Sequence, residues 1–420
     1  MAAFLKILII GNRGIQHALA VRLESEGYTV HVYPGQKNPI YTSVNYEQAI
    51  VNEYDLAIVG SARYFDHPIV SNLKSREIAI FGPDKNASLL ETSKIKFKEF
   101  ADFACIKTPE ARAFSEINSA LEYIRDRTGP FVIKANGPAR GCGVTIATTF
   151  DEAKIDLEHK LRDVNNPYYA GEVLIEEFIS GIEVAVNIFM DGKNFHVLPP
   201  TKPHKRRFDG DKGPLVAGMG SIASVPLNNF FYSELETLII RRTLDAIKVK
   251  GWDFRGCLFV NLMLTETEIY VLEYNCRMGD PAMLVDLMLL RSSLSNLLEK
   301  TVSQKLVDYK AEISEDTSCA ITLCSNNYPN DQEFGQEFDI SNLPILRPNM
   351  DSGIVIAGAE IADDSKFLRI TNGVVLSAIS TNKDRDLAKQ EAHKLAKLVP
   401  FLDMRTDIGN AFLIPKRWAR

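Results

Sequence analysis

The clearest chemical signal in the sequence is the strand-like run Leu272–Pro281, where acidic, amide and cationic side chains recur at alternate positions. Glu273 and Asn275 are two positions apart, so on a β-strand their oxygens share one face. One or two such oxygens, together with phosphate groups, form the usual ligand set of Mg²⁺. Arg277 falls on the same face again and can hold a developing acyl phosphate through two parallel hydrogen bonds. The run predicts a magnesium-dependent phosphate site.

Two lysines and a glycine-rich loop supply further groups that bind phosphate. Lys94 begins a helix-like segment and Lys134 lies in a short apolar strand, and both can neutralise nucleotide phosphates as point charges. The loop Asn136–Gly143 follows that strand and includes Gly141 and Gly143. Without side chains, such residues let backbone N–H groups approach phosphate oxygens closely.

Acidic residues at the end of the next strand predict contacts to a nucleoside. Glu176 and Glu177 lie near the end of the expected strand Leu174–Phe178 and can accept from an adenine amino group, while the backbone at Phe178 meets the ring. Glu183 lies far enough along the chain to reach ribose hydroxyls. Each feature alone has an ordinary explanation, since strand lysines extend to the surface and glycine-rich loops are commonly turns. Their order in one chain favours a nucleotide site.

The elements that carry these residues alternate between strand and helix at the N-terminal end. Phe4–Ile10 predicts a buried parallel strand, and Ile15–Glu26 has the spacing of an amphipathic helix. Between them, the turn Gly11–Gly14 can bind phosphate at a helix N-terminus, although such turns also simply join strand to helix. Further strands are expected at Tyr28–Tyr33, Asp55–Gly60 and Glu77–Gly82. About the first hundred residues therefore predict a doubly wound parallel sheet of an α/β fold.

The rest of the chain predicts paired strands and a final helix. A helix is expected at Lys94–Phe103. Strands are expected at Phe131–Ala135, Val144–Ala147, Leu258–Leu264, Glu268–Tyr274, Ser318–Cys324, Gly353–Ala357 and Val374–Ser380, with a helix near Asp386–Leu398.

The composition excludes several classes of protein. A net charge of −6 argues against a general nucleic-acid binder. Six cysteines without a CxxC pair indicate free thiols in a reducing compartment. No apolar run reaches the roughly 18 residues that a membrane-spanning helix needs. We therefore expect a cytoplasmic protein, monomer or homodimer, that binds neither nucleic acid nor membrane.

The order of these motifs resembles that of the phosphoribosylamine–glycine ligase family of the ATP-grasp superfamily. The resemblance runs nearly end to end, and Leu272–Pro281 is its strongest segment. The other matching segments are Gly11–Ala18, Phe81–Pro83, Leu90–Lys94, Val132–Ala135, Ile175–Glu183, His204–Arg206, Asp209–Pro214, Gly218–Gly220, Thr371–Gly373 and Asp407–Gly409. The resemblance implies a Rossmann-like domain at 1–104, an ATP-grasp lid at 105–190, a catalytic core at 191–325 and a C-terminal α/β domain at 326–420.

The same resemblance implies an ADP-forming ligase that joins a small carboxylate to an amine, using ATP and Mg²⁺ or Mn²⁺. In the family the pair is glycine and 5-phosphoribosylamine, and the product is glycinamide ribonucleotide. The nucleotide would be held by Lys94, Lys134, Gly141, Gly143, Glu176, Glu177, Phe178 and Glu183, and the metal by Glu273 and Asn275. Catalytic roles would fall to Arg277, Lys205 and Asp211. Substrate contacts would come from Gly11, Asn12, Gly14, His204, Arg206, Asp209, Gly218, Met219, Gly220 and Asp280.

Departures from the family pattern gather at the amine end. The family's first loop reads Gly-Asn-Gly-Gly-Arg-Glu-His-Ala, and here Arg13, Ile15 and Gln16 replace a glycine, the arginine and the glutamate. Elsewhere Ser61 and Ala62 replace Pro-Glu, Ala282 replaces a glutamate, and Cys142 replaces a lysine whose charge Arg140 can supply. When a ligand loses several of its polar partners in a site, the site loses specificity for that ligand. The pattern leaves two alternatives open, a paralogue with a different amine or carboxylate in a specialised pathway, and a purine enzyme that has drifted.

Two other classes of protein fit less well. A nicotinamide dehydrogenase needs an acidic residue at the end of its second strand, where Tyr33 and Pro34 stand. A non-catalytic ATP-binding protein has no need of metal ligands, yet Glu273 and Asn275 are both present together with Arg277.

Overall fold

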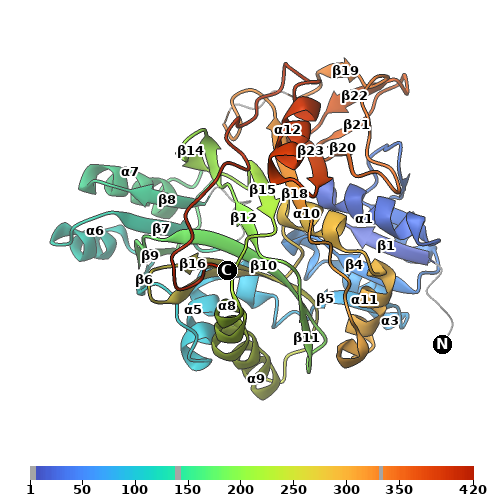
Figure 1. Ribbon diagram of the computed structural model, residues 1–420. Helices are drawn as coiled ribbons and strands as arrows, with labels where there is room; N and C mark the ends of the chain where they lie inside the picture. Colours follow the sequence, from blue (N-terminus) through green and yellow to red (C-terminus); the bar gives the residue numbers. More distant parts are fainter. Residues whose placement is uncertain (1–5, 138–142, 331–333) are drawn as a thin grey trace.

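The computed structural model of the protein describes residues 6–137, 143–330 and 334–420, and one large mixed sheet runs through it (Figure 1). Among the described residues this sheet has 14 strands, in the order β20-β23-β18-β15-β12-β10-β16-β5-β4-β1-β2-β3, with β11 and β17 paired at its side. The predicted α/β fold is confirmed. Arg140, Gly141 and Cys142, for which the sequence predicts contacts, lie outside the described residues.

The N-terminal part is the predicted doubly wound unit, in which β1 pairs in parallel with β2 and β4, and β4 with β5. Side chains of β1 are buried on both faces, because Ile7 and Ile9 enter one core cluster while Leu8 and Ile10 enter another. This explains the unbroken apolar run. The elements are β1 (Lys6–Ile10), α1 (Gly14–Ser25), β2 (Thr29–Tyr33), β3 (Thr42–Ser43), α2 (Tyr46–Val51), β4 (Leu56–Val59), a 3₁₀ turn (Ala62–Tyr64), α3 (Pro68–Ser75), β5 (Ala79–Pro83), α4 (Leu89–Thr92) and α5 (Lys94–Phe103).

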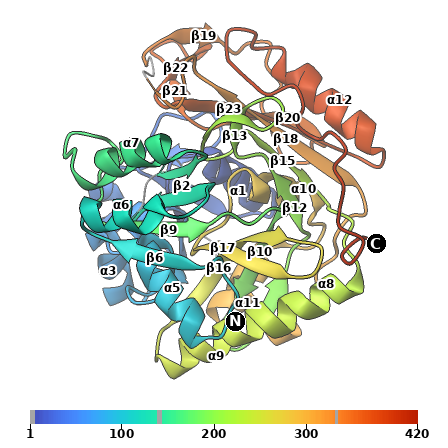
Figure 2. The ribbon, with the colours of Figure 1, turned by 90° about the vertical axis from the view of Figure 1, so that its left-hand side faces the viewer.

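The small sheet predicted as the lid stands to one side of the large sheet, with α6 and α7 packed on it (Figures 1 and 2). Its strands run in the order β6-β9-β7-β8, all antiparallel. The elements are β6 (Ala111–Phe114), α6 (Ile117–Arg125), β7 (Phe131–Ala135), β8 (Val144–Ala147), α7 (Phe150–Leu161) and β9 (Val173–Glu177). The glycine-rich loop therefore joins two paired strands, as predicted.

Long antiparallel strands form the middle of the large sheet. They meet the parallel unit where β16 pairs with β5, and a Cβ on Gly256 would lie 3.1 Å from the Gly82 Cα, so this crossing depends on glycine. The elements are β10 (Ile182–Met190), β11 (Phe195–Val197), β12 (Thr201–Pro203), β13 (Arg206–Phe208), β14 (Lys212–Leu215), β15 (Gly220–Ala223), α8 (Asn229–Glu234), a π-helical segment (Leu235–Ile240), α9 (Arg241–Val249), β16 (Phe254–Leu264), β17 (Ile269–Asn275), α10 (Ala282–Leu289), α11 (Leu294–Val302) and a 3₁₀ turn (Leu306–Asp308).

The C-terminal strands extend the large sheet at its other end. Alternate residues of β18 enter different clusters, since Ala320 packs with α10 and Ile321 packs with α12, so the two helices cover opposite faces. The elements are β18 (Thr317–Cys324), β19 (Glu337–Asp339), β20 (Ser352–Ile356), β21 (Ala359–Ile361), β22 (Phe367–Ile370), β23 (Val374–Asn382) and α12 (Arg385–Ala396). Among the described residues, no helix combines the length and apolar character needed to cross a membrane.

A carboxylate at the end of α1 fixes that helix to α11. Glu26 accepts hydrogen bonds from the N–H groups of Leu294 and Ser295, each at 2.8 Å, and pairs with Arg22 at 2.8 Å. Burial raises the pKa of Glu26, but these donors outweigh burial and hold it below its ordinary value. The contact orients α1, which carries the predicted phosphate-binding turn at its other end.

Replacing Glu26 by glutamine should lower the free energy of unfolding by about 1–3 kcal/mol at pH 7, because a charged acceptor for two helix N–H groups is lost. Since folding lowers the pKa of this carboxyl, its contribution is present above about pH 4.5 and fades as the pH falls through the lowered pKa. Urea unfolding of the wild type and the variant at pH 7 and pH 4 measures the loss of unfolding free energy and its dependence on pH. The exposed neighbour Glu24→Gln is the matched control, and an equal loss in both variants would contradict the assignment.

Candidate active site

Three neighbouring strands bring acidic and amide side chains to one face of the large sheet. Glu183 is on β10, Asn261 on β16 and Glu273 on β17, and Asn261 lies opposite Glu273 in the strand register. Lys205 reaches between the carboxylates, with its Nζ 2.6 Å from Glu183 and 3.1 Å from Glu273. The Asn261 amide donates to the same Glu273 oxygen at 3.0 Å. The structure thus joins Glu183, Lys205 and Glu273, for which the sequence predicts a nucleoside contact, a catalytic role and a metal-binding role.

The charges of this group reinforce one another. Burial raises the pKa of Glu273, but Lys205 and Lys134 act more strongly and lower it to about 2. Burial lowers the pKa of Lys205, but its two carboxylate partners outweigh burial and raise the pKa above its ordinary value. Both groups are therefore charged at neutral pH, and Lys205 is a fixed cation beside the predicted metal ligand.

A second ion cluster is centred on Glu176, which is 3% exposed. Its two oxygens pair with Lys134 at 2.6 Å and with Lys98 at 3.0 Å. The two lysines also donate to the backbone carbonyls of Leu272 and Pro109. Glu176, predicted to hold adenosine, therefore has both oxygens engaged by lysines, an arrangement that favours a role in fixing Lys134.

Lys94 connects helix α5 to the start of the glycine-rich loop. Its Nζ donates to the Gly137 carbonyl at 2.8 Å, and Asn136 accepts from the Ser93 hydroxyl at 3.1 Å. Burial lowers the pKa of Lys94, although Glu273 opposes the shift. The carbonyl of Gly143, at the far end of the loop, accepts from the Ala135 N–H at 2.9 Å. Loop and lysine are therefore brought together, as the phosphate site requires.

The other predicted nucleoside residues lie at the junction of the small sheet with the body. Glu177 accepts from the Glu110 N–H at 2.9 Å, and the Phe178 ring is exposed. A cavity of about 220 Å³ lies here, lined also by Tyr123 and Arg127. An exposed ring beside a cavity leaves apolar surface for a flat ligand to cover.

Arg277 does not continue the face of β17 as the alternation predicts, because β17 ends at Asn275 and the chain bends. The guanidinium instead turns toward α4, where its Nε is 3.0 Å from Glu91, and it also donates to the Asn275 amide oxygen at 3.3 Å. Glu91 further accepts from the Cys276 N–H at 2.7 Å. Arg277 thus stays beside Asn275, held there by a carboxylate of another element.

The predicted metal ligands fit Mg²⁺ bound together with a nucleotide. Glu273 and Asn275 offer a carboxylate and an amide oxygen from one strand, and among the described residues no group of three His, Cys, Asp or Glu side chains is arranged to hold a metal. A site with few protein oxygens leaves the remaining positions to phosphates and water, which is how Mg²⁺ is usually bound.

The turn after β1 is shaped by the residues that depart from the family pattern. The Gln16 side chain is 1% exposed and fills the space beside two glycines, since a Cβ on Gly11 or Gly60 would lie 2.8 or 2.5 Å from its Nε2. Its Oε1 accepts from the Arg13 N–H at 2.6 Å. Asn12 and Gly14 lie in the same turn, at the N-terminus of α1.

Asp280 lies beside this turn. Its carboxylate accepts from the Ile15 N–H, and burial raises its pKa while the nearby Arg13 and Arg277 lower it. The substituted Arg13 is therefore placed next to a predicted substrate residue.

Residues 204–219 leave the large sheet as an excursion that contains the β13–β14 hairpin. His204 is buried, and burial, reinforced by Lys202, lowers its pKa to about 4, so it is neutral at pH 7. Its Nδ1 has no hydrogen-bond partner within the described chain. At the other end of the excursion, Met219 donates to the His204 carbonyl at 2.7 Å, and a Cβ on Gly218 would lie 2.9 Å from Pro281. Gly220 then begins β15.

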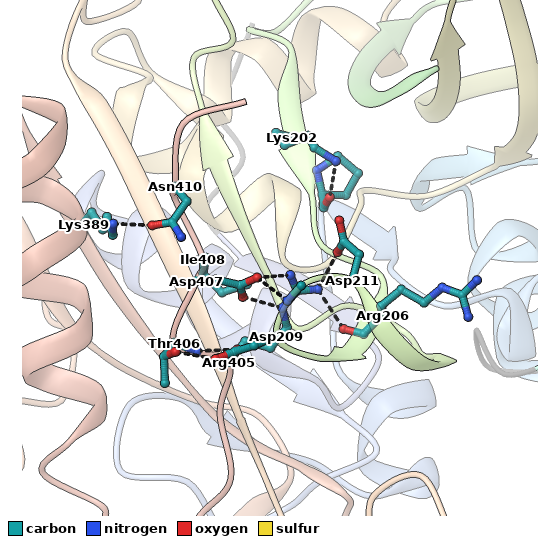
Figure 3. A network of polar contacts seen from close by, with 12 residues as sticks. Lys202, Arg206, Asp209, Asp211, Lys389, Arg405, Thr406, Asp407, Ile408 and Asn410 are labelled. Carbon is teal, nitrogen blue, oxygen red and sulfur yellow. Dashed lines mark hydrogen bonds and ion pairs between the residues drawn. The ribbon is translucent and has the colours of Figure 1, made fainter. Parts of the chain in front are cut away.

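The tip of the hairpin is bound by residues near the C-terminus (Figure 3). Asp211 pairs with Arg405 at 2.7 Å, and Asp209 accepts from the Thr406 N–H at 2.8 Å. Arg206 makes its contact through its backbone carbonyl, which accepts from Arg405 at 3.0 Å. Asp209 and Asp211, predicted for substrate and catalysis, are thus engaged within the protein.

The sequence did not point to several residues of the site. Lys98 carries a usable signal, because it lies one helical turn after Lys94 on α5. Glu91 lies in the matching segment Leu90–Lys94 but was given no role, and no local pattern marks Asn261 or Arg405, because each meets its partner from a separate element.

Comparison with known proteins gives a consistent result over the whole chain. The phosphoribosylglycinamide synthetase N domain matches residues 5–91, and the phosphoribosylglycinamide synthetase ATP-grasp (A) domain matches residues 92–283. A phosphoribosylamine–glycine ligase from Clostridium acetobutylicum is 31% identical over 427 residues, covering 97% of this chain and all of the relative.

Solved structures agree. A phosphoribosylamine–glycine ligase from Thermotoga maritima superposes with a TM-score of 0.83 at 28% identity, covering 96% of this chain and 100% of that one. The biotin carboxylase domain of the Hydrogenobacter thermophilus 2-oxoglutarate carboxylase, solved with ADP, magnesium and bicarbonate, gives a TM-score of 0.69 over 96% and 91% of the two chains. At 13% identity, that second likeness concerns the fold alone.

The contacts of Glu176 predict how its loss affects nucleotide binding. Glu176→Gln removes the shared anion between Lys98 and Lys134, so affinity for ATP and for GTP should fall by the same factor, about tenfold. Binding of both nucleotides, measured by calorimetry, gives the ratio. A selective loss of ATP over GTP would show that Glu176 contacts adenine instead. The exposed Glu99→Gln on α5 is the control.

Proposed function

This chain belongs to the phosphoribosylamine–glycine ligase family, and we propose that it joins glycine to 5-phosphoribosylamine with ATP, giving glycinamide ribonucleotide, ADP and phosphate. Similarity along 97% of the chain to a ligase that is itself covered completely is the observation that carries the proposal. It makes the protein an ATP-dependent carbon–nitrogen ligase. Its substrates are small molecules, and we place it in the cytoplasm as a monomer or homodimer.

The arrangement of lysines supports ATP as the phosphate donor. Lys134 is on β7, which leads into the glycine-rich loop, and Lys94 donates to the Gly137 carbonyl at the start of the loop. ATP phosphates bound there would be neutralised by both lysines, with Lys98 and Glu176 fixing the position of Lys134. Mg²⁺, held by Glu273 and Asn275, would draw negative charge from the phosphate oxygens when bound.

The chemistry that follows passes through an acyl phosphate. A glycine carboxylate oxygen attacks the γ-phosphorus of ATP, and the bond to ADP breaks. The amine nitrogen then attacks the carbonyl carbon, phosphate leaves with the original carboxylate oxygen, and the nitrogen releases a proton. Lys205 and Arg277, cations held by Glu183, Glu273 and Glu91, are placed to stabilise the charge on the transferred phosphoryl group.

The substrate end of the site lies between the turn after β1 and the excursion 204–219. His204 offers a buried Nδ1 with no partner in the described chain, which suits a contact to a bound substrate. Gly218, in the excursion, lies against Pro281 and the neighbouring Asp280. Asp280 also accepts from the Ile15 N–H after the β1 turn, so the excursion and the turn meet at Asp280.

A second candidate is a ligase of the same mechanism that takes another amine. It is favoured by Arg13, which places a cation beside Asp280, and by Gln16, which fills the space between Gly11 and Gly60. These are the positions where the chain departs from the family at the amine end.

The direct experiment is ADP release from ATP and Mg²⁺ with glycine and freshly generated phosphoribosylamine, beside a panel of other amines and amino acids. The proposal predicts turnover that requires both substrates. Turnover with a different amine only would support the second candidate, and no ADP release with any pair would contradict both.

Arg277→Ala should abolish turnover while ATP affinity changes by less than about threefold, because the side chain of Arg277 contacts Glu91 and Asn275, on elements other than those that carry Lys94 and Lys134. Isothermal titration with a non-hydrolysable ATP analogue and the ADP-release assay separate the two effects. Loss of nucleotide affinity with chemistry retained would show that Arg277 serves binding. Arg291→Ala, on the surface, is the control.

A further inference from the structure

A buried arginine far along the sequence lies at the centre of the contacts around the hairpin tip (Figure 3). Arg405 is 1% exposed, and its guanidinium makes bonds in two directions. Within its own segment it pairs twice with Asp407, at 2.7 Å each. Toward the hairpin it pairs with Asp211 at 2.7 Å and donates to the Arg206 carbonyl at 3.0 Å.

Two neighbours of Arg405 extend this contact, so we name residues 405–407 the strap. Asp407 accepts from the Gly210 N–H at 2.8 Å, and Thr406 donates its N–H to Asp209 at 2.8 Å. Each strap residue thus binds a different part of the hairpin tip, and the planar guanidinium joins Arg206, on β13, to Asp211, in the turn before β14. A lysine cannot make this set of bonds, because it lacks the fixed fork of donors.

The hairpin carries Lys205 at its base. Lys205 precedes the Arg206 carbonyl that Arg405 binds, and its own carbonyl accepts from the Val216 N–H at 2.8 Å. On the sheet side, His204 donates its N–H to the Gly220 carbonyl at 3.0 Å. The backbone of Lys205 is therefore held from the sheet on one side and by Arg405, through Arg206, on the other.

We propose that Arg405 is a positioning residue for Lys205, acting through the β13–β14 hairpin. The side chain of Lys205 is drawn toward Glu183 and Glu273 by charge, but ion pairs between long side chains tolerate several geometries. The position of the hairpin determines which of these geometries the Lys205 side chain adopts. Misplacement of a reacting group by about 1 Å can cost about a hundredfold in rate, so a distant contact of this kind can control catalysis. The inference rests on the proposed function, in which Lys205 acts on the transferred phosphoryl group.

The hairpin also lies against the small sheet, where β14 neighbours β8. The strand β8 pairs with β7, which carries Lys134, but the side chains of Lys94 and Lys134 bond to Gly137, Glu176 and Leu272, all outside the hairpin. Loss of Arg405 should therefore disturb the carboxylate and amine end of the site more than the nucleotide end.

The kinetic test compares Arg405→Met with Arg385→Met. Arg385 donates to the carbonyls of Gly409 and Asn410, which lie beyond the strap and outside the hairpin. For Arg405→Met we expect the KM for glycine or the amine to rise at least about fivefold and kcat to fall at least about tenfold, with the KM for ATP within about twofold. Arg385→Met should leave all three unchanged. If Arg405 only stabilised the fold, its loss would reduce the fraction of active enzyme, so kcat would fall while every KM stayed unchanged. That result would overturn the inference.

A second test needs no activity. Lys212 is exposed on β14 and offers a trypsin site on the hairpin. Cleavage there should be at least about tenfold faster in full-length Arg405→Met than in the wild type or Arg385→Met, because the strap no longer holds the tip. Equal cleavage rates in all three proteins would overturn the inference.

Asp407→Asn provides a variant that keeps the shape of the strap, in case Arg405→Met does not fold. It removes one charge from the Arg405 fork while the carboxamide oxygen still faces Gly210. We expect the KM for glycine or the amine and the rate of cleavage at Lys212 each to rise about threefold. Unchanged values in both would overturn the inference. If the wild type is inactive with glycine and phosphoribosylamine, the proposed function fails, and cleavage at Lys212 still decides whether the strap holds the hairpin.

Discussion

The central constraint on this site is that several charged side chains lie in or near a dry interior and must balance one another. An isolated buried ion costs several kcal/mol, so each lysine needs an anion and each carboxylate a cation. Glu176 is shared by Lys98 and Lys134, while Lys205 is shared by Glu183 and Glu273. Removing the shared member, Glu176 or Lys205, takes the ion-pair partner from two charges at once, so these two residues fix the positions of the others.

This balance also prepares the site for an anionic ligand. The cations are Lys94, Lys98, Lys134, Lys205 and Arg277, and the carboxylates are Glu91, Glu176, Glu183 and Glu273. The cations outnumber the carboxylates by one, and Lys94 contributes to the excess because its ammonium group donates to the uncharged Gly137 carbonyl. Nucleotide phosphates would therefore meet positive charge that the protein has already oriented, which reduces the reorganisation needed during phosphoryl transfer. The strands, the small sheet and the excursion 204–219 each supply part of this cluster.

The sequence predicted regular elements well because their signal is local. The bounds of α5, β7 and β8 agree with those expected from apolar periodicity, and the glycine turn after β1 leads into α1 as expected. The family was identified from many short segments that follow one another along nearly the whole chain, of which Leu272–Pro281, with Glu273 and Asn275, was the strongest.

Pairings between distant segments could not be predicted in this way. Arg277 leaves the face of β17 because the strand ends at Asn275, and its guanidinium then pairs with Glu91 on another element. Asp211 meets Arg405 across 194 positions of the sequence, and no local pattern marks such a pair. The ion pairs of Glu176 could not be predicted for the same reason, since only the fold shows that Lys98 and Lys134 face it together. Side-chain partners of this kind depend on how the elements pack.

The central claim is that the charge cluster serves transfer of a phosphoryl group to a carboxylate. The most direct measurement uses glycine labelled with ¹⁸O in its carboxylate, phosphoribosylamine and ATP, with mass analysis of the phosphate released. The account predicts one ¹⁸O atom in each phosphate formed, carried from the carboxylate through the acyl phosphate. Phosphate without ¹⁸O, formed together with the amide product, would contradict it.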